Sequence, residues 1–418
     1  MRLNEQLVDA AVVATADMLK FSQPADAVLS THFKIDRTGA RERAFIAEAA
    51  YAVIRHRRRL ARLVGSESPR RLLLAALVRF QGVSQRQLAE VVSPKEAEWL
   101  AQIKAMAEPQ LSLAELIDFP DWLVERLSAH FSEAELLALA QGLNQPAPLD
   151  LRVNEIKANR DEVLSQLAAE GIDATACRYA PFGIRLKGKP SLARHPLYLG
   201  GKIEVQDEGS QLLGHLLAPK RGEMVVDFCA GAGGKTLLLG ALMRSTGRLY
   251  AFDVAKKRLA KLKPRVARAG LSNVHPICIS GENDVRIKRL AGKIDRVLVD
   301  APCSGLGTLR RNPDLKWRQT PQSVAELTRK QADILNSAAR LVKDGGRLVY
   351  ATCSILPEEN EAIVDQFLAA HADFFRLSAA DALAKQLISY DGGETLRLWP
   401  HRQGTDGFFA VVMERRSS

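Results

Sequence analysis

The chain has 418 residues, of which 47% are hydrophobic, so it is long enough for two or three domains with buried cores. Lys and Arg number 59 against 48 Asp and Glu, and the resulting net charge of +11 favours a polyanionic partner. The five cysteines are widely spaced, form no Cys-x-x-Cys pair and are odd in number, which argues against a zinc site and a disulfide framework. Because there is no signal-peptide pattern and no run of about 18 apolar residues, we expect a cytoplasmic protein without a membrane span or a metal.

Residues 1–143 predict a helical domain without a catalytic signature of its own. Apolar side chains recur at helical spacing from Leu3 to Met18, and a second helix is predicted from about residue 40 to residue 63. Seven arginines, hereafter the arginine cluster, lie at the end of this second helix and just beyond it: Arg55, Arg57, Arg58, Arg59, Arg62, Arg70 and Arg71. They form either a solvated basic face or a patch that contacts phosphates, and the sequence leaves both interpretations open.

A linker is predicted at residues 144–148, where two prolines follow Asn144. Residues 146–200 then predict a small α/β segment, RRM-like, with a strand at 149–153, a helix capped by Asn159 and ended by Gly171, and a hairpin at 175–186. Five basic residues could make it a platform that positions RNA, or they could be ordinary surface charge: Arg152, Arg178, Arg185, Lys187 and Lys189.

From residue 201 to residue 418 strands alternate with helices, which predicts a mostly parallel sheet with helices on both faces. Strands are predicted at 224–228, 248–253, 274–279, 296–300 and 347–352, and helices near 236–243, 256–269, 285–291 and 321–342. Two final strands, 396–399 and 407–413, predict an antiparallel end to the sheet. The predicted fold class is therefore α/β with a Rossmann-like sheet, preceded by an all-α domain.

The stretch MVVDFCAGAGGKT, residues 224–236, is a strand, a glycine-rich loop and the start of a helix. Glycines in such a loop let a ligand approach the backbone closely. Two familiar patterns nearly fit and then fail: Cys229 stands at the first glycine of a P-loop, and Thr236 stands at the third glycine of a dinucleotide fingerprint. The loop alone predicts either a site for an adenosine-type ligand or a tight structural turn.

Acidic residues follow several of the predicted strands, at the edge of the sheet where ligands bind in such folds. Asp227 ends the first strand and Asp253 ends the second, where a carboxylate can accept both ribose hydroxyls of an adenosine ligand. The alternative is that Asp253 caps the following helix. Glu282 and Asp284 follow the third strand, near the expected adenine edge, and Asp300 ends the fourth.

Two cysteines follow the fourth and fifth strands, Cys303 in a Pro-Cys sequence and Cys353 in a Thr-Cys sequence. A single buried cysteine is by default a small hydrophobic residue, but two at the same sheet edge are harder to explain in that way. Methylation of carbon 5 of cytosine needs such thiols. Because this carbon is a poor nucleophile, a thiolate must first add to carbon 6 before carbon 5 can attack a methylsulfonium group.

The chain resembles the RNA cytosine-5 methyltransferases of the Sun/nucleolar-protein type, through VVDFCAGAGGKT, AFDVAKKRL, DRVLVDAPCSGLGTLRRNPDLKW, LVYATCSILPEENEAIV and DGFFAVVM. The resemblance runs from about Ile203 to Met413. It implies a class I methyltransferase domain with a seven-stranded sheet at 201–418. Residues 1–143, with GARERAFIAEAAYAVIRHRRRL, are similar to the NusB-like RNA-binding domain of the bacterial small-subunit members. DNA cytosine methyltransferases use the Pro-Cys cysteine instead and lack the second one.

The resemblance also implies roles for individual residues. Cys353 would be the nucleophile, and Cys303 would help to release the product. S-adenosylmethionine would be held by Cys229, Ala230, Gly231, Ala232, Gly233, Gly234, Lys235, Asp253, Asp284 and Asp300, with Asp300 near the base and with Glu282 as the alternative to Asp284. The chain departs from the family at Gly231–Ala232, where Ala-Pro is usual, and this removes no group that could bind the ligand.

We therefore expect an S-adenosylmethionine-dependent RNA cytosine-5 methyltransferase that acts on 16S ribosomal RNA as a monomer. One rival is a P-loop NTPase, against which Cys229 and the two cysteine motifs argue. A rival of another class is a non-catalytic RNA-binding or ribosome-assembly factor that kept the fold. The presence of both Cys303 and Cys353 argues against that interpretation.

Overall fold

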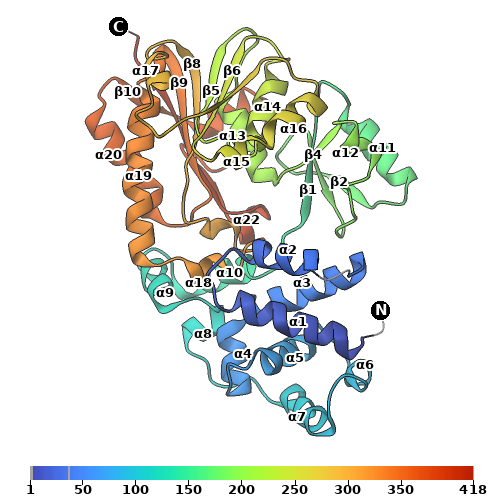
Figure 1. Ribbon diagram of the computed structural model, residues 1–418. Helices are drawn as coiled ribbons and strands as arrows, with labels where there is room; N and C mark the ends of the chain where they lie inside the picture. Colours follow the sequence, from blue (N-terminus) through green and yellow to red (C-terminus); the bar gives the residue numbers. More distant parts are fainter. Residues whose placement is uncertain (1–2, 36–37, 418) are drawn as a thin grey trace. The chain divides into compact units, whose positions relative to one another are not determined.

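The computed structural model describes residues 3–35 and 38–417, and it consists of two compact units (Figure 1). The helical unit comprises Met1–Pro146 together with Thr308–Pro321, and the α/β unit comprises Ala147–Gly307 together with Gln322–Ser418. The sequence assigned residues 308–321 to the methyltransferase domain, whereas their packing groups them with the helical unit. The division into three domains at residues 143, 146 and 200 stays a prediction.

The helical unit is built from short helices around one apolar core, as its periodicity predicted. They are α1 (Glu5–Met18), α2 (Ala25–Ile35), α3 (Ala40–Arg55), α4 (Arg57–Val64), α5 (Pro69–Arg79), α6 (Gln85–Leu88), α7 (Pro94–Ala105), α8 (Leu113–Ile117), α9 (Asp121–Ser128), α10 (Glu133–Leu143) and α18 (Leu315–Arg318). Capping boxes start three of them, at Ser84, Ser93 and Ser112. The predicted helix at 40–63 is two helices, because the backbone leaves the helical conformation at His56.

Residues 308–321 contact the rest of the helical unit through hydrogen bonds as well as through apolar packing. The indole nitrogen of Trp317 donates to the carbonyl of Ile54 at 2.8 Å, and its ring packs against the helical core. Lys316 is fully buried, and its ammonium donates to the carbonyl of Arg55 and to Asn144 Oδ1, both at 2.9 Å. Burial lowers the pKa of Lys316 to about 7. This segment is therefore an integral part of the helical core.

The α/β unit begins with a four-stranded antiparallel sheet in the order β2-β3-β1-β4. Its elements are β1 (Leu149–Val153), α11 (Arg160–Ala169), β2 (Ala174–Ala176), β3 (Gly183–Leu186), α12 (Pro196–Leu199) and β4 (Ile203–Val205). The predicted helix limits are confirmed: Asn159 accepts from the backbone of Asp161 at 2.8 Å, and Gly171 has a φ of 74°. β4 lies beyond the predicted boundary at residue 200 and nevertheless pairs with β1.

The larger sheet of the described residues has eight strands, with the path β10-β12-β9-β8-β5-β6-β7 and β11 paired to β12. The strands are β5 (Met224–Asp227), β6 (Arg248–Asp253), β7 (Val274–Cys278), β8 (Ile294–Asp300), β9 (Val342–Thr352), β10 (Phe374–Leu377), β11 (Leu396–Leu398) and β12 (Phe408–Arg415). Strands β5 to β9 pair in parallel, and β10, β11 and β12 pair antiparallel. The predicted fold class is confirmed, with β11 as an eighth strand.

Helices cover both faces of this sheet (Figure 1). They are α13 (Glu208–Leu217), α14 (Gly234–Leu242), α15 (Lys256–Leu259), α16 (Leu262–Ala269), α17 (Val285–Lys288), α19 (Pro321–Ala339), α20 (Glu361–Ala370), α21 (Ala379–Ala384) and α22 (Pro400–Gln403). Val226 faces α19 and α20, and its neighbour Val225 faces α13 and α14, as strand alternation requires. Along the described residues, no helix is long and apolar enough to cross a membrane.

The chain starts the parallel sheet at β5, adds β6 and β7 on one side, and then returns to add β8 and β9 on the other. The order of the strands therefore reverses between β5 and β8. Ligands bind beyond the carboxyl ends of the strands at such a reversal, and the glycine loop that follows β5 lies there.

Candidate active site

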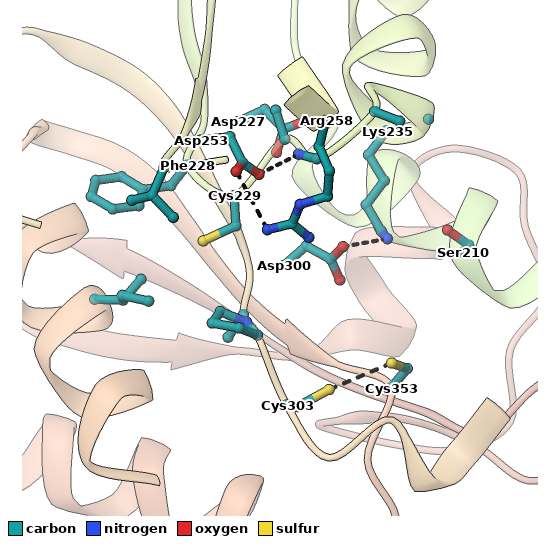
Figure 2. Close-up of a pocket in the computed structure, with 18 of the residues that line it drawn as sticks. Ser210, Asp227, Phe228, Cys229, Lys235, Asp253, Arg258, Asp300, Cys303 and Cys353 are labelled. Atoms are coloured by element: carbon teal, nitrogen blue, oxygen red, sulfur yellow. Dashed lines mark hydrogen bonds and ion pairs between the residues drawn. The ribbon is translucent and has the colours of Figure 1, made fainter. Parts of the chain in front are cut away.

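A cavity of about 430 Å³ lies at the carboxyl ends of β5, β6, β8 and β9 (Figure 2). Its walls come from the glycine loop, from the residues that end the strands, and from α19. Of the residues predicted for the site, these line the cavity: Cys229, Ala230, Gly231, Ala232, Gly234, Lys235, Asp253, Asp300, Cys303 and Cys353. The two that do not are Gly233 and Asp284.

The glycine loop is held open by positive φ angles and by hydrogen bonds from its backbone. Gly231 has a φ of 57°, and its N–H donates to Asp253 Oδ2 at 2.8 Å. Gly233 has a φ of 89°, and a Cβ there would lie 2.1 Å from a methyl carbon of Leu262. The need for glycine at 233 is therefore conformational and steric, since the residue does not reach the cavity.

Asp253 does not cap α15, whose N-cap is Ala255, and its binding of a ligand ribose stays a prediction. Its Oδ1 accepts from the backbone of Ala255 at 2.6 Å, which supports the turn into α15. Its Oδ2 accepts from Gly231, and the residue also lines the cavity. One carboxylate thus fixes the glycine loop and faces the ligand space.

Asp284 and Glu282 have different surroundings. Asp284 caps the short helix α17, accepting from the backbone of Ser280 and of Arg286, each at 2.9 Å, and it pairs with the Arg286 side chain at 2.6 Å. The bond from Arg286, helped by these backbone donors, holds the pKa of Asp284 well below its usual range. Glu282 lines the cavity. The geometry favours Glu282 as the residue that can reach a ligand.

The carboxyl groups of Asp300 and Asp227 each contact a side chain in the first turn of α14. Lys235 Nζ lies 2.6 Å from Asp300 Oδ2 (Figure 2). Burial opposes the charge of Lys235, but the Asp300 carboxylate outweighs it and the pKa of the lysine is raised. Asp227 is buried, which raises its pKa to about 7, and its Oδ2 accepts from the hydroxyl of Thr236 at 2.6 Å. Its Oδ1 is buried and has no hydrogen-bond partner.

The two predicted catalytic thiols are in contact. Cys303 Sγ lies 3.4 Å from Cys353 Sγ, and both residues face the cavity (Figure 2). The hydrogen bond to Cys353, together with burial, raises the pKa of Cys303 well above its ordinary value. The third cysteine of the cavity, Cys229, also has a raised pKa because it is buried. β8 and β9 are parallel neighbours in the sheet, and their pairing brings the two cysteine loops together.

Comparison with known proteins assigns the chain to a family. The family model for 16S rRNA methyltransferase RsmB/F matches residues 214–414, and the RsmF/B-like ferredoxin-like domain matches residues 119–193. A Synechocystis protein named probable ribosomal RNA small subunit methyltransferase B is 38% identical over 74% of this chain and 69% of its own length. The chain belongs to the RsmB/F family of rRNA methyltransferases.

Solved structures agree with this assignment for the fold. The crystal structure of PH0851 has a TM-score of 0.81, with 29% identity over 99% of this methyltransferase and 100% of that chain. The structure of NSun6 from Pyrococcus horikoshii with SFG has a TM-score of 0.64, with 21% identity over 72% of this chain and 100% of that one.

The sequence did not single out several residues that line the cavity of this methyltransferase: Gln206, Ser210, Val254, Arg258, Ile279, Lys330 and Ile334. Lys330 and Ile334 lie one turn apart on α19, a spacing that puts them on one side of the helix. The helix itself was predicted, near residues 321–342. The sequence has no signal for which side of α19 faces the cavity, because that depends on how the helix packs on the sheet.

The basic side chains of the methyltransferase differ in whether they already pair with acidic side chains. Within the arginine cluster, Arg57 pairs with Glu67 at 3.5 Å, Arg58 with Asp121 at 2.6 Å and Arg59 with Glu108 at 2.8 Å. By contrast, four exposed lysines on α15, α16 and the turn between them pair with no acidic group among the described residues. These lysines, hereafter the lysine surface, are Lys256, Lys257, Lys261 and Lys263. Val254 and Arg258, which line the cavity, come from the same stretch of chain.

Outside the lining of the cavity, one group of the described residues could present three metal ligands: Asp150, Cys177 and Glu208. Arg185 lies among them, at 2.7 Å from Asp150 and 3.4 Å from Glu208. Its guanidinium supplies the positive charge that the two carboxylates need. The group is therefore explained by an ion pair that joins β1, β3 and α13.

Proposed function

We propose that this methyltransferase transfers a methyl group from S-adenosylmethionine to carbon 5 of a cytosine in small-subunit rRNA, through a covalent bond between Cys353 and carbon 6. The observation that carries the proposal is the contact between the thiols of Cys303 and Cys353 in the wall of the same cavity as the glycine loop. A factor that only bound RNA would have no use for two thiols in this position.

The chemistry of the cavity fits the proposed cofactor. S-adenosylmethionine carries an ammonium and a sulfonium group, and the cavity contains the carboxyl groups of Asp227, Asp253, Glu282 and Asp300. Asp227 Oδ1 is a buried acceptor without a partner, which suits an ammonium donor. Asp253 would bind the ribose, and Glu282, or Asp284 after a rearrangement, the adenine. When bound, the cofactor supplies the electrophilic methyl group. The NSun6 neighbour of the same fold was solved with SFG, an analogue of S-adenosylmethionine.

The proposed roles of the two thiols depend on which of them is deprotonated and which keeps its proton. Cys353 as a thiolate would form a bond to carbon 6 and make carbon 5 nucleophilic. Loss of the carbon 5 proton after methylation then restores the double bond and breaks the bond between sulfur and carbon 6. The raised pKa of Cys303 supports this assignment, because Cys303 keeps its proton and can donate a hydrogen bond to the Cys353 thiolate. Once Cys353 is bonded to carbon, the main cause of that raised pKa disappears, so Cys303 can lose its proton to solvent, and the resulting thiolate can accept the proton from carbon 5.

The proposal is tested by incubating the protein with 16S rRNA and S-adenosylmethionine labelled in the methyl group, followed by digestion to nucleosides. We expect the label in 5-methylcytidine. Label in any other nucleoside would refute the cytosine-5 assignment, and no label with a protein that binds both RNA and cofactor would favour the assembly-factor alternative. Bisulfite sequencing of the product then identifies the cytosine.

A further inference from the structure

A buried carboxyl group joins the two cysteine loops. Glu359 is fully buried, and its Oε1 accepts from the backbone N–H of Ser304 at 2.8 Å. Its Oε2 accepts from the hydroxyl groups of both Ser304 and Ser354. These serines directly follow Cys303 and Cys353 in the sequence. Each thiol is therefore one residue away from a group that Glu359 holds.

The same carboxyl group is tied to α19, the helix that contributes to the cavity wall. Gln331 Nε2 donates to Glu359 Oε1 and to the carbonyl of Pro302, both at 3.0 Å. The neighbouring residue Lys330 lines the cavity. From the other direction, the hydroxyl of Tyr350 on β9 donates to the backbone carbonyl of Glu359 at 2.7 Å. Glu359 thus connects β9, α19 and both cysteine loops.

Four donors meet the two oxygens of Glu359, which is the full number that a carboxylate accepts. With all four acceptor positions filled, the carboxylate of Glu359 resists displacement, although one atom of the network, Gln331 Oε1, is buried without a hydrogen-bond partner. Glu359 is not among the residues that line the cavity, so it does not touch a bound substrate. A carboxylate with only a structural role could lie anywhere in the core. Here three of the four donors belong to the residues that directly follow the two cysteines.

We propose that Glu359 is a positioning residue that holds the sulfur atoms of Cys303 and Cys353 in contact. The geometric part of this inference stands on the hydrogen bonds alone, and its consequence for catalysis rests on the proposed function. The two loops are also joined directly, since the N–H of Gly307 donates to the carbonyl of Cys353 at 2.8 Å. That bond fixes the backbones, and Glu359 fixes the residues that carry the thiols.

The network predicts an asymmetry between the two serines. Ser304→Ala removes a hydroxyl, but the backbone N–H of residue 304 still binds Glu359 Oε1. Ser354→Ala removes the hydrogen bond that links the Cys353 loop to the carboxyl group. Ser354→Ala should therefore loosen the thiol pair more than Ser304→Ala does.

Oxidation of the thiol pair measures the geometry without any need for methylation. Diamide, a two-electron oxidant of thiols, joins Cys303 and Cys353 in a disulfide, taking up their two protons and two electrons. The rate is followed by mass spectrometry of the linked peptides. We expect Glu359→Gln to slow disulfide formation by about tenfold or more, because a displacement of about 1 Å has large effects on reactions between fixed groups. Ser354→Ala should slow it too, and Ser304→Ala should slow it less.

Asp295→Asn is the matched control. Asp295 accepts the backbone N–H of Met224 at 2.7 Å and lies at the start of β8, the opposite end of the strand from the Cys303 loop. Its replacement removes a hydrogen-bonded carboxylate of the same sheet, one that also pairs with Lys343, and should leave the oxidation rate unchanged. An oxidation rate of Glu359→Gln equal to that of the native protein would overturn the proposal. If that variant does not fold, the difference between Ser354→Ala and Ser304→Ala decides, and equal rates would overturn it.

Methylation kinetics give the second measurement. Glu359→Gln should lower kcat and leave the KM for RNA and for S-adenosylmethionine unchanged, because neither ligand touches Glu359. The two hypotheses fail separately. If Glu359→Gln slows oxidation but the native protein makes no 5-methylcytidine, the proposed function is wrong and the positioning role stands. If the native protein makes 5-methylcytidine and Glu359→Gln oxidises at the native rate, the positioning role is wrong.

Discussion

Lys235 and Asp300 form an ion pair across the cavity, with Nζ and Oδ2 2.6 Å apart. Lys235 lies in the first turn of α14 and Asp300 ends β8, so the pair joins the glycine loop to the strand that leads to Cys303. Asp300 is what raises the pKa of a lysine whose burial would otherwise lower it.

Asp300→Asn should therefore make methyl transfer sensitive to alkaline pH. Without the carboxylate, burial lowers the pKa of Lys235, and the ammonium is lost as the pH rises. We expect the rate to fall by about two orders of magnitude at neutral pH, from misplacement of the reacting groups, and to decline further at higher pH. The measurement is the pH dependence of single-turnover methylation. A variant whose profile has the shape of the native one would show that Asp300 does not control the charge of Lys235.

Asp227 predicts a pH dependence of cofactor binding. Its pKa is raised to about 7 by burial, so in the free protein its proton contributes stability at acid pH that is lost as the pH rises through about 7. An ammonium group next to Oδ1 would favour the charged carboxylate. Affinity for S-adenosylmethionine should then rise with pH up to about 7 and level off above it. Calorimetry across this range is the measurement, and Asp227→Asn should bind more weakly with little pH dependence. If that variant keeps the native pH dependence, another group is responsible.

The two thiols should be separable by a covalent trap. Cys353→Ala should abolish methyl transfer and leave cofactor binding intact, because the nucleophile is gone. Cys303→Ala should still form the bond to carbon 6 but fail to resolve it, so that protein and RNA remain joined on a denaturing gel. The trapped species needs cofactor, and the double variant should not form it. A trapped band from Cys353→Ala, with none from Cys303→Ala, would mean that the roles are reversed.

Salt dependence should distinguish the lysine surface from the arginine cluster. Exposed lysines that contact phosphates release counterions, so replacing Lys256, Lys257, Lys261 and Lys263 by Gln should reduce the slope of log K against log salt by up to about 3. Replacing Arg57, Arg58 and Arg59 by Gln should lower the melting temperature and leave the slope nearly unchanged, because these arginines already pair with acidic residues. The opposite pattern would identify the arginine cluster as the phosphate contact.

The local signals in the sequence predicted most of the α/β unit. The strand before the glycine loop, the acid that ends β6 and the two cysteine loops are marked by residue types at short spacing, and the structure brings them to one cavity. The choice between Glu282 and Asp284 was not predictable, since it depends on how the loop after β7 turns. Contacts between residues far apart in the chain could not be predicted from the sequence either. The contact of Glu359 with Ser304 spans 55 residues, and the pairing of the arginine cluster depends on helix packing.

The position of residues 308–321 has a consequence for the order in which the protein is made. The helical unit comprises the first 146 residues, but its core also contains Trp317 and the fully buried Lys316. Domains that are continuous in sequence can fold as they leave the ribosome, the N-terminal one first. This helical unit cannot, because its last piece is synthesised after β8 and the Cys303 loop. A ribosome that stalls before residue 321 would release a chain in which neither unit is complete. Completion of the helical unit thus waits until residue 321 of 418 has been translated.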